Sequence, residues 1–97
     1  MSHTQFINNT AENQFELHVG EQFAFLEYIL QDEKIYLSHT EAPEALRGTG
    51  AAASIVKQAL QYAREHGLTV VPSCSYVAAY LNKTDEWNDV LSDGYQM

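Results

Sequence analysis

Two glycines spaced by one residue form the part of the chain whose residue types are best suited to chemistry. They lie in the run Arg47-Gly48-Thr49-Gly50-Ala51-Ala52, between a strand-like segment and a long amphipathic stretch. Glycine has no Cβ, so its backbone reaches conformations in which successive N–H groups converge on one anion, and a following helix adds its unpaired amides. The run therefore predicts a phosphate site. The alternative is that Gly48 and Gly50 only turn the chain and start the helix.

Cys74 and His39 are the side chains best suited to nucleophilic and acid–base chemistry. Cys74, the only cysteine, follows a predicted strand and precedes a predicted short helix from Ser75 to Leu81. A helix N-terminus favours the thiolate, the nucleophilic form of the thiol. His39 ends another predicted strand, and histidine is the usual general base near neutral pH. Each also has a structural interpretation, Cys74 as a small buried side chain and His39 as a residue of the core or its rim.

Three alternating segments predict the first strands that position these residues. Apolar and polar side chains alternate in Phe15 to Val19, Phe23 to Leu30 and Lys34 to His39. Gly20-Glu21 and Gln31-Asp32-Glu33 supply the turns between them. The pattern predicts a three-stranded antiparallel meander.

The next segment predicts a strand–helix–strand unit. Apolar residues recur at three- and four-residue spacings and predict a helix from about Gly50 to His66; these are Ala52, Ile55, Val56, Ala59, Leu60 and Ala63. Gly67 can cap that helix, and Leu68 to Val71 reads as a short buried strand ended by Pro72. If this strand is parallel to the one ending at His39, their carboxyl ends share one edge of the sheet. His39, Cys74 and the glycine run should then meet at that edge, where open sheets with helical crossovers bind ligands.

The last quarter of the chain predicts a short helix and the remainder of the core. Tyr76, Val77 and Tyr80 fall at helical spacing and can form an apolar face. Trp87, Val90 and Leu91 are expected to complete the core.

Composition limits the classes of partner. Residues 1–97 are predicted to form one domain, and 13 acidic against 5 basic residues give a net charge of −8. This charge argues against nucleic acid or an anionic membrane as a partner and suits a cationic or amine-bearing substrate, although acidity also serves solubility. No apolar run approaches the roughly 20 residues that cross a bilayer, so a cytoplasmic location is expected. His3, His18 and His66 are expected at the surface without metal-site spacing, so no metal is predicted.

The chain resembles the GNAT superfamily of acyl-CoA-dependent N-acetyltransferases. Arg47 to Ala52 fits the R/Q-x-x-G-x-G/A signature, and Pro72-Ser73-Cys74 supplies a Pro-x-Cys motif at the end of the next strand. The likeness covers about residues 34–80, including His39-Thr40 and Ala59 to Arg64, and is nearest to the short single-domain GNAT-like group.

The resemblance implies an α+β minimal GNAT-like fold, with an antiparallel meander, a βαβ unit and a C-terminal helix. It implies acetyl-CoA as cosubstrate, with its pyrophosphate bound by the glycine run and its pantetheine arm between the splayed parallel strands. The residues of the run are Arg47, Gly48, Thr49, Gly50, Ala51 and Ala52. Tyr80 falls where superfamily members often place the tyrosine that protonates the departing CoA thiolate. The acceptor would be a small-molecule or protein amine, and the chain a monomer or weak homodimer.

Two mechanisms remain open. In the first, the amine attacks the acetyl thioester directly, and a side chain takes its proton. In the second, Cys74 accepts the acetyl group first, which needs a base such as His39 and gives ping-pong kinetics.

The chain departs from the family pattern in two places, one relative to full-length members and one relative to the short group. The chain ends soon after Tyr95, before the further strands of those members, and Lys83 to Glu86 stands where the short group often has His-Pro. The acceptor surface is therefore expected to be reduced. The alternatives to catalysis are an acyl-CoA-binding or sensing module, and an interaction domain in which the glycines only turn the chain.

Overall fold

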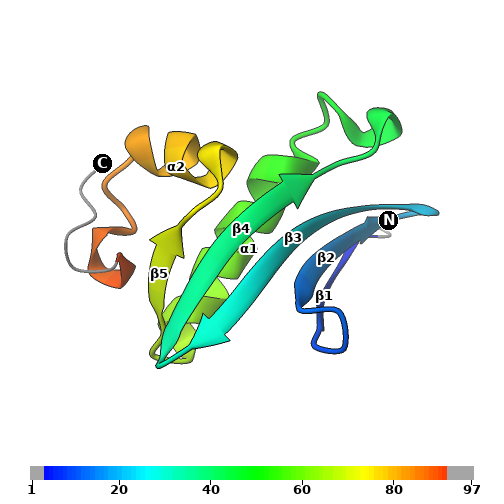
Figure 1. The fold of residues 1–97 in the computed structure, drawn as a ribbon. Helices are drawn as coiled ribbons and strands as arrows, with labels where there is room; N and C mark the ends of the chain where they lie inside the picture. The colour runs from blue at the N-terminus through cyan, green and yellow to red at the C-terminus, as the bar shows by residue number, and fades with distance from the viewer. Residues whose placement is uncertain (1–3, 92–97) are drawn as a thin grey trace.

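Five strands form one sheet in the order in which they occur in the chain. The computed structural model describes residues 4–91. The strands are β1 (Thr4–Asn9), β2 (Gln14–Val19), β3 (Gln22–Gln31), β4 (Lys34–Glu41) and β5 (Thr69–Pro72). The helices are α1 (Ala51–Glu65) and α2 (Ser75–Asn82), with short 3-10 turns η1 (Glu44–Leu46) and η2 (Asn88–Val90). Figure 1 shows α1 crossing behind the sheet and α2 continuing from the end of β5.

The predicted α+β architecture is confirmed, and the meander is one strand longer than predicted. Strands β1 to β4 pair antiparallel and β5 pairs parallel to β4, so β4, α1 and β5 form the expected βαβ unit. The prediction of three antiparallel strands is wrong because β1 was missed. Thr4–Asn9 is an edge strand in which only Phe6 and Ile7 are apolar, and because these two are adjacent the segment shows no alternating pattern.

Helix α1 covers one face of the sheet and forms most of the core with it. Its inward residues are Ile55, Val56, Ala59, Leu60 and Ala63, all fully buried. They face buried side chains of the sheet such as Phe15, Leu26 and Leu37. The predicted stripe is confirmed except at its start, where Ala51 is buried and Ala52 is half-buried. In the described part of the chain no helix runs along the opposite face of β1–β4, which we call the open face (Figure 1).

A bulge in β4 changes which residues face the core. Leu37 pairs with Tyr28 and His39 pairs with Glu27, so Ser38 is the extra residue. Without the bulge, strict alternation would place His39 on the same face as Leu37. With it, His39 lies on the open face, and Thr40, which pairs with the buried Leu26, lies on the core face.

The end of the described chain closes the core as predicted. Trp87 and Val90 are buried, and Leu91 forms a parallel bridge with Val70 beside β5. The Arg64 guanidinium lies 4.3 Å from the Trp87 ring and binds the Asp89 carboxylate through two hydrogen bonds of 3.0 and 2.6 Å. These contacts fix η2 against α1.

Candidate functional site

The glycine run forms a tight loop whose backbone only glycine adopts easily. Gly48 and Gly50 have φ values of 81° and 85°, and Gly50 is the N-cap of α1. A Cβ added at either position would meet no atom within 4 Å. The glycines are therefore required by backbone conformation rather than by lack of space.

The loop leaves a set of amide donors free at the start of α1. Thr49 braces the turn, because its hydroxyl donates to the Leu46 carbonyl at 2.5 Å and accepts from the Ala51 amide at 3.3 Å. Ser54 N–H, one turn into the helix, donates to Gly50 C=O at 2.9 Å. Within residues 4–91, the backbone N–H groups of Gly48, Gly50, Ala52 and Ala53 donate no hydrogen bond to a backbone carbonyl of a turn, loop or helix cap. These N–H groups and the positive end of α1 suit an anion.

These amides open onto a groove of about 380 Å³, which we call the glycine-loop groove. Five of the six residues predicted to bind the cofactor line it, namely Arg47, Gly48, Gly50, Ala51 and Ala52. The sixth, Thr49, holds the turn from within. Arg47 has no ion pair among the described residues, so its guanidinium is available to a phosphate. This set of donors suits a phosphate or diphosphate group.

Tyr76 also lines this groove and was not singled out as a site residue. It lies in the first turn of α2, and 40% of its surface is exposed. Tyr80, the predicted proton donor, is one turn further along the same helix and packs half-buried against the core. The helical spacing of the two tyrosines could have identified Tyr76, but only the position of α2 beside the glycine loop brings it to the groove.

Cys74 is the N-cap of α2 and lies against the end of β4. Its amide donates to the Leu37 carbonyl at 2.8 Å, and its Sγ lies 3.5 Å from the Thr40 hydroxyl. Burial acts to raise the pKa of the Cys74 thiol. Hydrogen bonds from the Thr40 hydroxyl and from backbone amides that include Tyr76 and Val77 outweigh it and lower the pKa below its ordinary value of 9.0. The side chain is only 8% exposed.

His39 reaches the same edge of the sheet but from the other face. Its Nε2 lies 3.9 Å from the Glu41 carboxylate, and its ring centroid is 6.1 Å from that of Phe25. Its side chain is 53% exposed. Within residues 4–91 the sulfur of Cys74 forms a hydrogen bond with the hydroxyl of Thr40. Within that part of the chain it forms none with His39. The topology thus brings the two residues to one edge, and the bulge puts their side chains on opposite faces.

The β4–β5 pair separates beside this site. The two strands pair from Lys34 with Thr69 to Leu37 with Pro72, and β4 then continues from Ser38 to Glu41 without a β5 partner. Ligands of open sheets with helical crossovers bind at this carboxyl edge of the parallel strands.

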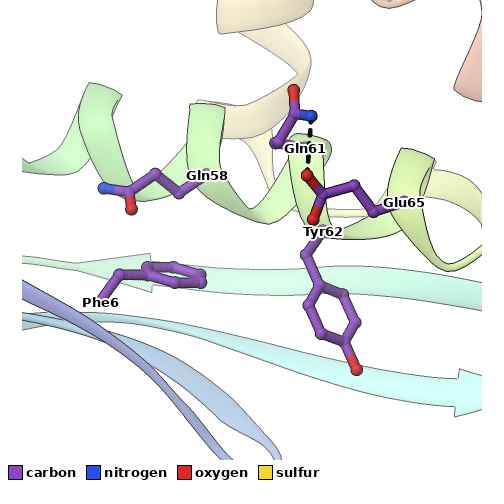
Figure 2. Close-up of a pocket in the computed structure, with 5 residues that line it drawn as sticks. All are labelled: Phe6, Gln58, Gln61, Tyr62 and Glu65. Atoms are coloured by element: carbon purple, nitrogen blue, oxygen red, sulfur yellow. Dashed lines mark hydrogen bonds between the residues drawn. The ribbon is translucent and has the colours of Figure 1, made fainter.

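A separate hollow of about 280 Å³ lies between α1 and β1. Figure 2 shows Gln58, Gln61 and Glu65 on the helix above Phe6 of β1, with Gln61 donating to Glu65 at 3.1 Å. Tyr62 points from the helix toward the sheet, where its ring meets that of Phe15 edge-on at 5.2 Å. None of the predicted site residues line this hollow.

The described residues contain neither a grouping of metal ligands nor a helix of membrane-spanning character. Among residues 4–91 no group of three or more His, Cys, Asp or Glu side chains is placed to hold a metal ion. No helix in that part of the chain is long and apolar enough to cross a membrane.

Two comparisons with known proteins concern the chain as a whole. The family model described as GCN5-related N-acetyl-transferase matches residues 14–90. A solution structure of a GCN5-like protein from Staphylococcus aureus, a candidate N-acetyltransferase, is similar over 99% of this chain and 94% of its own, with 28% identity and a TM-score of 0.74. The matched region includes the glycine loop, Cys74 and Tyr80.

Proposed function

Because the chain belongs to the GCN5-related N-acetyltransferase family, we propose that it transfers an acetyl group from acetyl-CoA to an amine. The observation that carries the proposal is the glycine loop, in which Gly48 and Gly50 take left-handed conformations and leave amides free beside Arg47. These donors would bind the pyrophosphate of coenzyme A. The end of β4 that extends beyond its pairing with β5 would bind the pantetheine arm and bring the thioester toward Cys74 and Thr40.

Direct transfer is the simpler route. The lone pair of a neutral amine attacks the thioester carbonyl, the N–C bond forms, and the C–S bond breaks with its electron pair leaving on the sulfur of coenzyme A. We assign the amine proton to His39, which is exposed on the open face beside Glu41. Tyr80 or Tyr76, both on α2, would return a proton to the thiolate.

The covalent route uses Cys74 as the first acceptor. Its lowered pKa increases the thiolate fraction at neutral pH, and the donors that lower it are Thr40 and the amides at the start of α2. This activation does not involve His39. The thiolate would take the acetyl group and release coenzyme A, and the amine would then take the acetyl group from Cys74.

Calorimetric titration with acetyl-CoA tests the proposed cofactor site. Gly50→Glu places a carboxylate among the proposed phosphate donors, so we expect its affinity to fall at least 100-fold. Gly67→Glu is the matched control, because Gly67 also has a positive φ, 67°, and lies at the far end of α1. Wild-type affinity in Gly50→Glu would contradict the site. A folded wild type with no affinity for acetyl-CoA would favour a glycine loop that only turns the chain.

Two further measurements distinguish direct from covalent transfer, and a transferase from a non-catalytic binding module. A 42 Da acetyl adduct on Cys74 after brief mixing with acetyl-CoA, together with loss of turnover in Cys74→Ala, supports the covalent route. Turnover retained in Cys74→Ala supports direct transfer. Saturable binding of acetyl-CoA without release of coenzyme A across a panel of amines would instead indicate a non-catalytic acyl-CoA-binding module.

A further inference from the structure

A second hollow adjoins the glycine-loop groove on the open face of the sheet. It measures about 310 Å³, and Ala42 and Arg47 line both hollows. We call it the aromatic–acidic hollow for its other walls, which include Phe23, Phe25, Glu41 and Glu44. A ligand in it would lie next to the proposed cofactor site.

Aromatic rings form a continuous row along this part of the open face. His18 stacks on Phe23 at 4.8 Å, Phe23 and Phe25 are 6.4 Å apart, and Phe25 is 6.1 Å from His39. Phe23 is 40% exposed. The face of an exposed aromatic ring attracts a cation.

The charges at the hollow also favour a cation. Among the described residues, the one ion pair of Glu41 is with the imidazole of His39 at 3.9 Å, and Glu44 has none. Arg47 is the only cation among the lining residues. It also lines the glycine-loop groove, where a pyrophosphate would neutralise it. Two carboxylates and two rings then face any cation that enters.

An amine held by these two carboxylates must lose its extra proton before it can attack the thioester. Carboxylates stabilise the ammonium form, which has no lone pair to form the N–C bond. The hollow instead suits a second ammonium group that stays charged while another amino group of the same molecule reacts. We propose that the acceptor is a small aliphatic diamine, with one ammonium held by Glu41, Glu44 and the rings of Phe23 and Phe25. This inference rests on the proposed acetyl transfer.

Arg47 couples the two sites. A free guanidinium repels an ammonium in the adjoining hollow, and a bound pyrophosphate removes that repulsion. Diamine affinity is therefore higher in the presence of coenzyme A than in its absence.

Binding of 1,4-diaminobutane and of butylamine, followed by amide chemical shifts in the presence of coenzyme A, tests the proposal without requiring turnover. We expect diaminobutane to bind roughly tenfold more tightly than butylamine, with shifts in Phe23–Phe25 and Glu41–Glu44. Glu41→Gln/Glu44→Gln should abolish this preference. The matched control is Glu12→Gln/Glu33→Gln, which changes the net charge equally in the turns at the opposite end of the sheet and should keep it.

The outcomes separate the two proposals. Equal binding of the two amines, or an unchanged preference in the Glu41→Gln/Glu44→Gln protein, overturns the diamine inference. Acetylation of other amines in that case leaves the transferase function standing. Tight, Glu41- and Glu44-dependent diamine binding without release of coenzyme A from acetyl-CoA supports the ligand class and overturns the transferase function. Acetylation of diaminobutane with at least a tenfold higher kcat/KM than butylamine supports both.

Discussion

Both faces of the sheet carry apolar side chains, but those on one face are buried under α1 and several on the other are exposed. The face under α1 buries its apolar residues in one core cluster that includes Phe15, Leu26 and Leu37. The open face carries Phe23 and Ile29 in contact with solvent, beside histidines and carboxylates. Apolar side chains under the helix stabilise the fold, whereas those on the open face gain little from burial and are available to a ligand.

The proposed sites lie where these two faces meet. The glycine loop and Cys74 belong to the covered side, because α1 and α2 position them. His39 and the aromatic–acidic hollow belong to the open side. An acetyl group bound on one side would have to meet an amine held on the other, and the end of β4 beyond its pairing with β5 lies between the two.

The largest expected difference between the faces is in stability. Ile55→Ala removes a fully buried side chain under α1, and we expect the free energy of unfolding to fall by about 2–5 kcal/mol. Ile29→Ala makes the same chemical change on the open face, where the side chain is 56% exposed, and should alter it by no more than about 0.5 kcal/mol. Urea unfolding measures both. Equal losses would show that the open face is covered in solution.

A smaller loss of stability is expected for a substitution in the glycine loop, which precedes the helix α1 that covers the sheet. Gly50→Ala forces an L residue into a left-handed conformation at φ 85°, which costs about 1–2 kcal/mol even though the added Cβ meets nothing. Gly20→Ala, at φ 62°, should cost a similar amount. Only the Gly50 variant should also weaken acetyl-CoA binding, as measured by calorimetry. If both variants weaken it equally, the loop has no special role in binding.

The open face also holds a buried carboxylate whose contribution depends on pH. Glu16 is 8% exposed and accepts hydrogen bonds from His18, Asn9 and Gln14. The bond from His18, then that from Asn9, lowers its pKa below 4.5 against the effect of burial. Its stabilisation is therefore present above about pH 4.5 and is lost as the pH falls through the lower, folded-state pKa.

Glu16→Gln tests this dependence. We expect Tm to fall by a few degrees at neutral pH, and the difference from wild type to shrink below about pH 4.5. Thermal unfolding followed by circular dichroism across this range measures it. A difference that stays constant to pH 2 would mean that ionised Glu16 does not stabilise this face.

The smallest expected effect concerns the thiol on the covered side. Thr40→Val removes a hydroxyl that lies 3.5 Å from Sγ, so the pKa of Cys74 should rise toward its ordinary value of 9.0. The pH dependence of alkylation by iodoacetamide reports this shift. His39→Gln is the control from the open face and should leave the profile unchanged. A shift in His39→Gln equal to that in Thr40→Val would mean that the two faces are coupled at this edge.

Local pattern was enough to predict most of the elements. The stripe from Ile55 to Ala63 predicted α1, and the alternation in Phe15 to Val19 predicted β2. Turn residues located the hairpins. The pattern failed at β1, where an edge strand carries little periodic signal, and at Ser38, where one extra residue reverses the faces of the rest of β4.

The glycine loop shows how far a motif can be interpreted without a structure. Its spacing and its place before an amphipathic helix predicted a phosphate site, and the groove is lined by five of the six named residues. The roles of Cys74, His39 and Tyr80 remain predictions. Their partners depend on contacts between segments up to 34 residues apart, as between Thr40 and Cys74, and local periodicity carries no information about such contacts.

The sequence alone therefore predicted most of the elements, their order and a phosphate site at the glycine loop, because each prediction depends on residues within a few positions of one another. Only the tertiary structure decided that His39 faces away from Cys74, that Thr40 meets the thiol, and that Tyr76 enters the groove. It also placed the aromatic–acidic hollow beside the glycine loop. These features arise from strand register, a bulge and the packing of α2, which depend on the whole chain.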